Sequence, residues 1–282
     1  MATILDTLKK GTEYLQKYQI DEARLNMEHL IAHVLKMDRM QLYLDFDRPL
    51  SEEALNSLRA LTMRRSKGEP LQHLLGTVEF LGLEFKTDGR ALIPRPETEE
   101  LVDLLLSMES LRPTAVLDLG CGSGVIGLTL AKQLSPAPAK VFLSDISAEA
   151  LSLARENGSL HGIEGNLTFL ESDLFGSIDD SFDLIVANLP YIPNCDATDL
   201  SREVQQDPSL ALYGGEVGTE IVQRALTDAW DHLTPGGLIA LEIGIHQADD
   251  LKTFAEDHGY FPVEVVKDLS EIDRFIFATK PA

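Results

Sequence analysis

The stretch AVLDLGCGSGVIGLTLA, residues 115–131, decides the fold of this 282-residue chain. Its apolar start enters a turn with glycine at three alternate positions, Gly120, Gly122 and Gly124, and an apolar periodic segment follows. This pattern is typical of a strand, a tight loop and the start of a helix. Glycine is favoured in such a loop because a residue without Cβ adopts positive φ at low cost and lets a ligand approach the backbone. We therefore expect a ligand at this helix start.

Two acidic residues follow strand-like runs near this turn. Asp118 ends the first run, and Asp145 closes the next one, VFLSD. A carboxylate at the end of the second strand, about 20 residues beyond the glycines, is placed to bind ribose hydroxyls. The loop spacing is G-x-G-x-G, and Val125 stands where a dinucleotide fingerprint has its third glycine. The sequence thus favours a cofactor with one nucleoside, and a nicotinamide-dependent oxidoreductase is the weaker alternative.

Strand and helix patterns alternate through the rest of this region. After the glycine turn we expect a helix over 125–134, a strand over 141–145, a helix over 148–157, strands over 167–171 and 184–187, a turn and strand over 234–244, and two strands within 263–280. This order predicts an α/β fold with a doubly wound, mostly parallel sheet and an antiparallel edge. In such a sheet the ligand crevice lies at the carboxyl ends of the strands.

The first part of the chain has a different character. Residues 1–74 read as a small helical bundle, in which Asp21 and Ser51 are candidate N-caps. A hairpin around Gly82 then leads to a helix that we expect to begin at Pro96. We place the boundary near residue 75, which gives a helical domain over 1–74 and a hairpin linker plus catalytic domain over 75–282.

Charge separates the same two parts. The net charge is −22; residues 1–74 carry 11 basic and 11 acidic side chains, and residues 75–282 carry 13 and 35. A surface that binds the phosphate backbone of a nucleic acid needs clustered Lys and Arg. The acidic part has no such cluster, so we expect a polypeptide partner and no direct contact with nucleic acid.

Composition narrows the class further. Apolar residues make up 44% of the chain, enough for a sizeable core. No run approaches the length of a membrane span, and the start lacks the pattern of a secretion signal, so we expect a cytoplasmic protein with no membrane contact. The two cysteines, Cys121 and Cys195, do not favour a disulfide or a zinc site. His29 and His33 are four residues apart but lack a third ligand, so no metal is expected.

The tetrapeptide Asn188-Leu189-Pro190-Tyr191 leaves a short buried strand at the edge of the sheet that also carries the glycine turn. The Asn188 side-chain oxygen and the Leu189 main-chain carbonyl can both accept hydrogen bonds from an NH₂ group, while Tyr191 can cover a planar face. Proline restricts the residue before it to extended backbone. A simple strand-ending turn would have a similar composition, but together with the glycine turn and Asp145 the segment favours catalysis.

These features together resemble a known family. The combination of VLDLGCGSG, Asp145 and a tetrapeptide like (N/D)PPY is similar to the S-adenosylmethionine-dependent amino-methyltransferases, which have a Rossmann-like fold. More narrowly, EPLQHLLGTVEFLGLEF, IPRPETEELV, ANLPYIP, ALYGGEVGTE and LEIG resemble the HemK-type (PrmC) protein-(glutamine-N5) methyltransferases, which methylate the glutamine of the GGQ motif in peptide chain release factors. This resemblance covers nearly the whole chain.

The resemblance implies a role for each matching position. Gly120, Cys121, Gly122, Ser123 and Gly124 would bind the methionine part of S-adenosylmethionine, Asp145 the ribose, and Asp173 and Leu174 the adenine, with Asn188 also near the cofactor. Asn188, Leu189, Pro190 and Tyr191 would hold the substrate glutamine, and Arg95, Pro96 and Glu97 would line the entrance. From its separate charge character, we hypothesise that the helical bundle docks the release factor, and we expect a monomer.

One position departs from the family pattern. Leu189 stands where the family usually has its first proline. Because that position acts through its main-chain carbonyl, leucine can keep the contact with less rigidity. NLPY is also typical of rRNA adenine dimethylases, so an adenine-N6 methyltransferase acting on rRNA or DNA is the alternative function. A non-enzymatic binding module would leave the tetrapeptide without a purpose.

Overall fold

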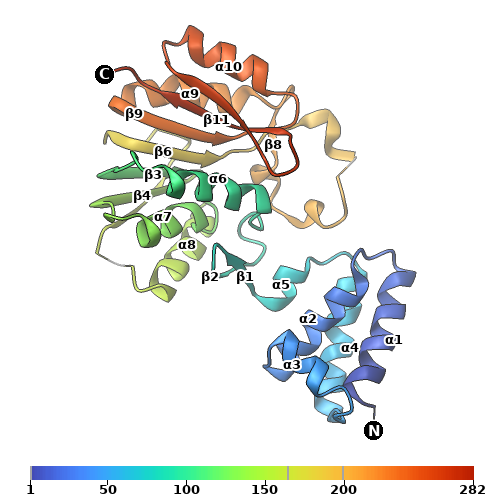
Figure 1. Ribbon diagram of the computed structural model, residues 1–282. Coiled ribbons are helices and arrows are strands. Elements are labelled where there is room, and N and C mark those ends of the chain that lie inside the picture. Colours follow the sequence, from blue (N-terminus) through green and yellow to red (C-terminus); the bar gives the residue numbers. More distant parts are fainter. Residues whose placement is uncertain (1, 164, 199) are drawn as a thin grey trace. The chain divides into compact units, whose positions relative to one another are not determined.

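The computed structural model describes residues 2–163, 165–198 and 200–282, and the chain divides into two compact units (Figure 1). The first unit contains residues 1–77 together with residues 201–206. The second contains residues 78–200 and 207–282. The division between them falls two residues beyond the boundary expected near residue 75, and the short segment 201–206 joins the first unit although it lies far along the chain.

The first unit is helical. Its elements are α1 (Ile4–Lys17), α2 (Ala23–Leu35), α3 (Arg39–Leu44), α4 (Glu52–Ser66), α5 (Leu71–Leu75) and the 3₁₀ helix η2 (Val204–Gln206). Ser51 caps α4 as expected, because its Oγ accepts a hydrogen bond from Ala54 N at 3.2 Å. Leu58 and Thr62, one turn apart on α4, are buried in the bundle.

The expected cap at Asp21 is wrong. The N-cap of α2 is Glu22, whose φ of 46° is left-handed and whose side chain makes no capping bond. The Asn26 side chain instead donates to the carbonyls of Asp21 and Glu22, and Asn26 Oδ1 accepts from Arg65 Nε at 2.6 Å. A buried amide inside the helix therefore organises this turn, which local capping rules could not indicate.

The second unit is built around a seven-stranded sheet with the order β10-β11-β9-β6-β3-β4-β5. Its strands are β3 (Ala115–Leu119), β4 (Lys140–Asp145), β5 (Leu167–Glu171), β6 (Phe182–Asn188), β9 (Leu233–Glu242), β10 (Val263–Lys267) and β11 (Asp273–Thr279). The five strands from β9 to β5 in this order run parallel, and β11 is antiparallel to both β9 and β10. The predicted fold class, with its antiparallel edge, is confirmed.

Helices cover both faces of this sheet (Figure 1). On one face lie α6 (Pro96–Ser107), α7 (Val125–Gln133) and α8 (Ala148–Leu160), and on the other lie α9 (Glu220–His232) and α10 (Ala248–Asp257). Alternate residues of β3 serve the two cores: Val116 packs with α6 and α7, whereas Leu117 and Leu119 pack with α9. The helix expected to end at residue 157 continues for one further turn, to Leu160.

Short elements complete the unit. They are β1 (Thr77–Phe80), whose first residue lies at the division, β2 (Leu83–Lys86), η1 (Asn194–Thr198), β7 (Ile192–Pro193), η3 (Ser209–Ala211) and β8 (Tyr213–Gly215). β1 and β2 form the hairpin expected around Gly82, which has a φ of 74°. Pro96 is the first residue of α6, as its fixed φ favours. Among the described residues, no helix is both long and apolar enough to cross a membrane.

Candidate active site

The order of the strands places a crevice between β3 and β6. From β3 the chain moves outward through β4 and β5, and it then returns to pair β6 with the other side of β3. In an open parallel sheet a ligand binds beyond the carboxyl ends of the strands, where this change of direction occurs. The glycine turn follows β3 and the tetrapeptide beginning at Asn188 follows β6, so both segments border the crevice.

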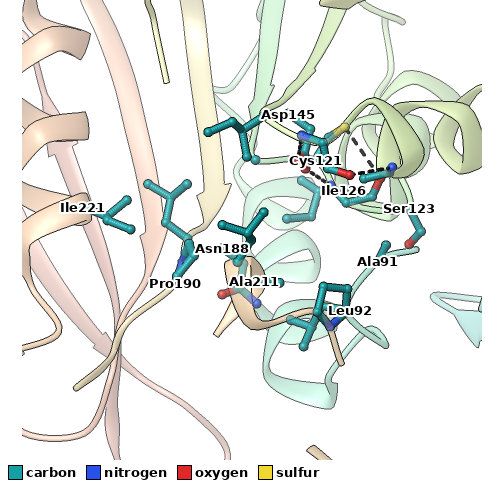
Figure 2. Close-up of a pocket in the computed structure, with 18 of the residues that line it drawn as sticks. Ala91, Leu92, Cys121, Ser123, Ile126, Asp145, Asn188, Pro190, Ala211 and Ile221 are labelled. Carbon is teal, nitrogen blue, oxygen red and sulfur yellow. Dashed lines mark hydrogen bonds between the residues drawn. The ribbon is translucent and has the colours of Figure 1, made fainter. Parts of the chain in front are cut away.

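A cavity of about 550 Å³ occupies this position (Figure 2), a size common for small-molecule sites. The glycine turn, the ends of β4, β5 and β6 and the segments around residues 90–98 and 208–213 surround it. The sequence-predicted residues that line it are Gly120, Cys121, Gly122, Ser123, Asp145, Asp173, Leu174, Asn188, Leu189 and Pro190. The structure thus brings ten predicted positions together.

The two loops are in direct contact. Gly120 has a φ of 71°, and a Cβ at this position would lie 2.9 Å from Leu189 Cδ2. The Leu189 side chain is buried in the core beneath the sheet edge. Glycine is therefore favoured by the backbone conformation, and a Cβ at this position would also force the Leu189 side chain to shift. The leucine that replaces the proline typical of the family packs against the glycine turn.

Asp145 ties the glycine turn to the start of α8. Its Oδ2 accepts from Gly122 N and its Oδ1 accepts from Ser147 N, both at 2.9 Å. Burial raises the pKa of this carboxyl, and these backbone donors oppose the shift. Because each carboxylate oxygen has two lone-pair directions, Asp145 can still accept hydrogen bonds from ligand hydroxyls.

Asp118 lies behind the turn. It is fully buried, and its Oδ2 accepts from Gly127 N, in the first turn of α7, at 2.7 Å. Within the described part of the chain, its Oδ1 is buried without a hydrogen-bond partner. Burial raises the pKa of Asp118 to about 7. This side chain is outside the cavity lining and connects the end of β3 to the first turn of α7.

Asn188 belongs to a buried chain of polar side chains. Its Nδ2 donates to Thr98 Oγ1 at 2.9 Å, and Thr98 Oγ1 donates to Glu242 Oε2 at 2.7 Å. The Tyr191 hydroxyl donates to the other carboxyl oxygen, Glu242 Oε1, at 3.2 Å. Burial is the main cause that raises the pKa of Glu242 to about 7 and that of Tyr191 above its ordinary value. Asn188 and Thr98 line the cavity, whereas Glu242 lies behind them.

Asp173 and Leu174 follow the end of β5, after Ser172, and both line the cavity. Leu174 adopts a left-handed φ of 48°, and Ser172 Oγ donates to its carbonyl at 2.7 Å. The exposed Asp173 carboxylate forms an ion pair with Arg224 at 3.2 Å. A strained backbone held by a local hydrogen bond is consistent with a defined binding position.

Five predicted positions lie outside the described lining: Gly124, Tyr191, Arg95, Pro96 and Glu97. Gly124 is the N-cap of α7, and a Cβ there would meet Ala154, Leu128 and Leu143 at 3.1 Å, so its place is in the packing of the turn. Arg95 pairs with Asp207 at 2.6 Å. Their neighbours Pro94 and Thr98 line the cavity instead.

Sequence reasoning missed a further set of lining residues. They are Arg90, Ala91, Leu92, Thr98, Ile146, Leu210, Ala211, Tyr213, Ile221 and Arg224. Thr98, Ala211 and Tyr213 lie within IPRPETEELV and ALYGGEVGTE, stretches that carry the family resemblance, but were given no role in the site. Ile146 carried a signal of its own, because it directly follows Asp145 at the end of a strand; in the structure this apolar side chain is 53% exposed. No local pattern indicated that Glu242 is the partner of Thr98, since the two are 144 residues apart, although Glu242 lies within the LEIG stretch quoted above.

A family model gives the class of protein, and a solved structure shows the same fold. The catalytic unit is similar to the T. thermophilus 16S rRNA methyltransferase RsmC in complex with AdoMet and guanosine, with a TM-score of 0.53, 21% identity and coverage of 72% of this chain and 49% of that chain. Residues 112–253 match the Methyltransferase domain family. The fold and the glycine-turn cavity are those of a Rossmann-like methyltransferase.

The family follows from the whole chain. Residues 6–76 match the PrmC N-terminal domain. A Geobacter sulfurreducens protein named release factor glutamine methyltransferase is 40% identical over 97% of this chain and 95% of its own length. A Chlorobaculum tepidum protein of the same name is 36% identical over 96% and 95%. The chain belongs to the release factor glutamine methyltransferase family.

The residues present fit S-adenosylmethionine, the cofactor of this methyltransferase. The glycine backbone is open to a ligand, the Asp145 carboxylate retains acceptor capacity for two neighbouring hydroxyls, and the exposed apolar Ile146 adjoins it. The cavity is also larger than the space that a single amino acid or a lone base would fill. The same cavity reaches Asn188, so cofactor and substrate can meet in it.

Proposed function

We propose that this enzyme transfers a methyl group from S-adenosylmethionine to the side-chain amide nitrogen (N5) of the glutamine in the GGQ motif of peptide chain release factors. The observation that carries the proposal is the contact between the glycine turn and the tetrapeptide, Gly120 against Leu189, at one cavity that also exposes Asn188. The names of the curated relatives, 36–40% identical over nearly the whole chain, support the choice of substrate.

The cofactor supplies a methyl group on a sulfonium, which is already a good electrophile. The protein must then supply geometry, because an amide nitrogen is a weak nucleophile whose lone pair is delocalised. Asn188 Nδ2 is engaged by Thr98, which leaves Asn188 Oδ1 as the acceptor for the substrate NH₂. The main-chain carbonyl of Leu189 would be the second acceptor. Two acceptors fix the nitrogen and stabilise the positive charge that develops on it.

The helical unit is proposed to dock the release factor. It carries as many basic as acidic side chains, whereas residues 75–282 carry the whole net charge of −22, so the two parts would contact chemically different surfaces of a substrate. Arg95, Pro96 and Glu97 are proposed to border the path of the glutamine, because Pro94 and Thr98 on either side line the cavity. We further propose that the enzyme acts in the cytoplasm, as a monomer and without direct contact with nucleic acid.

The experiment that tests the proposal offers two substrates in parallel. Purified enzyme and methyl-labelled S-adenosylmethionine are incubated with a bacterial release factor or with ribosomal RNA, and the label is counted in each. We expect label in the release factor and none when its GGQ glutamine is replaced by glutamate. Label in the RNA and none in the release factor would support the adenine-N6 alternative and overturn the proposal.

A further inference from the structure

The ends of β6 and β9 place an amide beside a buried carboxyl group. In the parallel register of these two strands, Asn188 is the partner of Glu242, and both are the last residues of their strands. Thr98, in the first turn of α6, lies between the two side chains and contacts both. Glu242 is only 1% exposed, and the carboxyl does not reach the cavity.

When Glu242 is ionised, its charge sets the direction of both hydrogen bonds that Thr98 Oγ1 makes. Above its pKa of about 7 the carboxyl group can only accept, so the single hydroxyl proton of Thr98 must be donated to Glu242 Oε2. Thr98 Oγ1 then has only lone pairs for its other neighbour, which must be the donor Nδ2 of Asn188. The amide of Asn188 is thereby held with NH₂ toward Thr98 and with Oδ1 as the group left for a ligand.

We propose that Glu242 and Thr98 are positioning residues that fix the orientation of the Asn188 amide for methyl transfer. The inference rests on the proposed function, in which the substrate presents an NH₂ group. If the Asn188 amide turned over, it would offer NH₂ to NH₂, the hydrogen bond would be lost, and two donors would face each other. Only the orientation set by Glu242 gives an acceptor.

A role in fold stability alone does not explain why a carboxyl group is buried at position 242. A buried carboxyl group costs free energy unless its partners compensate. In the described part of the chain, the hydrogen bonds to the Glu242 carboxyl come from two neutral hydroxyls, those of Thr98 and Tyr191. The nearby guanidinium of Arg274 bonds instead to Asp268 and to the carbonyl of Ile243. A neutral glutamine of the same shape would be less costly to bury, but it could not impose a direction on Thr98.

The first test replaces the charge and keeps the shape. In Glu242→Gln the new NH₂ can donate to Thr98, which then can donate to Asn188 Oδ1 and hold the amide in the wrong orientation. We expect kcat for release-factor methylation to fall about tenfold or more, while the Kd for S-adenosylmethionine stays within about twofold of the wild-type value. Glu99→Gln, one residue after Thr98 on the same helix and bonded to Leu81 N, is the matched control and should retain wild-type kcat.

The second test changes the relay hydroxyl. Thr98→Val is nearly isosteric but removes the hydroxyl, and Thr98→Ser restores it. We expect Thr98→Val to lose kcat as Glu242→Gln does and Thr98→Ser to retain most of it. The double variant Glu242→Gln/Thr98→Val should be no slower than the slower single variant, because both changes disable the same connection from Glu242 through Thr98 to Asn188. Losses that multiply would overturn the proposal, as would a Glu242→Gln enzyme with wild-type kcat.

The pH profile gives a readout that a merely structural role would not move. The groups facing Glu242 are Glu97 and Thr98 from α6, Tyr191 after β6 and Arg274 from β11. Protonated Glu242 can donate to Thr98, so wild-type kcat should fall as the pH drops below about 7. That acidic decline should be absent in Glu242→Gln, and an unchanged decline in the variant would overturn the proposal. A wild-type enzyme that adds no methyl group to the GGQ glutamine would instead refute the proposed function.

Discussion

Replacing Asp145 by alanine tests whether this carboxylate binds the cofactor. The carboxylate makes two hydrogen bonds of 2.9 Å, to Gly122 N in the glycine turn and to Ser147 N before α8. Both residues line the cavity, so in the alanine variant water can reach the two N–H groups. Buried groups left unpaired usually cost about 1–3 kcal/mol, and we expect the total loss of stability to lie near the lower end of this range.

The loss of binding free energy for the cofactor should be larger than the loss of folding stability. Hydrogen bonds from hydroxyls to a carboxylate contribute about 1.5–3 kcal/mol, and a loss of this size corresponds to a Kd roughly 10–100 times higher. Isothermal titration calorimetry of S-adenosylmethionine binding measures the change, and thermal unfolding without ligand measures the stability.

The control is Glu171→Gln. Glu171 is the register partner of Asp145 on β5, but its side chain is exposed and outside the cavity lining. It should bind S-adenosylmethionine with wild-type affinity. A Kd for Asp145→Ala within about twofold of wild type, in a folded protein, would refute the assignment of this carboxylate to the cofactor.

Three other predictions follow from single contacts. Asn188→Ala should lower kcat by about 100–1,000-fold with little change in the Kd for S-adenosylmethionine, because it removes an acceptor used at the reacting nitrogen; wild-type turnover would contradict this. Gly120→Ala should destabilise the protein by more than about 1 kcal/mol and weaken cofactor binding, since its φ is 71° and its Cβ would clash with Leu189, whereas Gly89→Ala, with open space around its Cβ, should be tolerated. Burial raises the pKa of Asp118 from 3.8 to about 7, so the native state binds more protons than the unfolded state between these pH values. The free energy of unfolding should therefore fall as the pH rises through this window. Thermal unfolding at pH 5.5 and 7.5 checks the sign, and Asp118→Asn should reduce the difference between the two.

Local patterns were sufficient to predict the centre of the catalytic unit. The strand, turn and helix around the three glycines occur at the expected residues, because steric freedom and hydrophobic periodicity act over a few positions. The position of Asp145 and Asn188 at one edge follows from the parallel direction of β3, β4 and β6. Alternation of strands and helices was enough to predict a doubly wound sheet.

Contacts between distant segments could not be predicted in this way. Thr98 meets Asn188 across 90 residues and Glu242 across 144, and no local propensity encodes either pairing. Glu242 did carry one visible signal, an acidic residue directly after the apolar strand residues 238–241. The error at Asp21 has a similar origin, because the buried Asn26 and Arg65, 39 residues apart, determine how α2 begins.

The most direct test of the whole account is a crystal structure of the enzyme with S-adenosylhomocysteine and a GGQ peptide. We predict the glutamine carboxamide nitrogen at about 3 Å from both Asn188 Oδ1 and the Leu189 carbonyl oxygen, with the cofactor sulfur on the side of residues 120–124. A peptide bound elsewhere, or an Asn188 amide that presents its NH₂ to the glutamine nitrogen, would contradict the account.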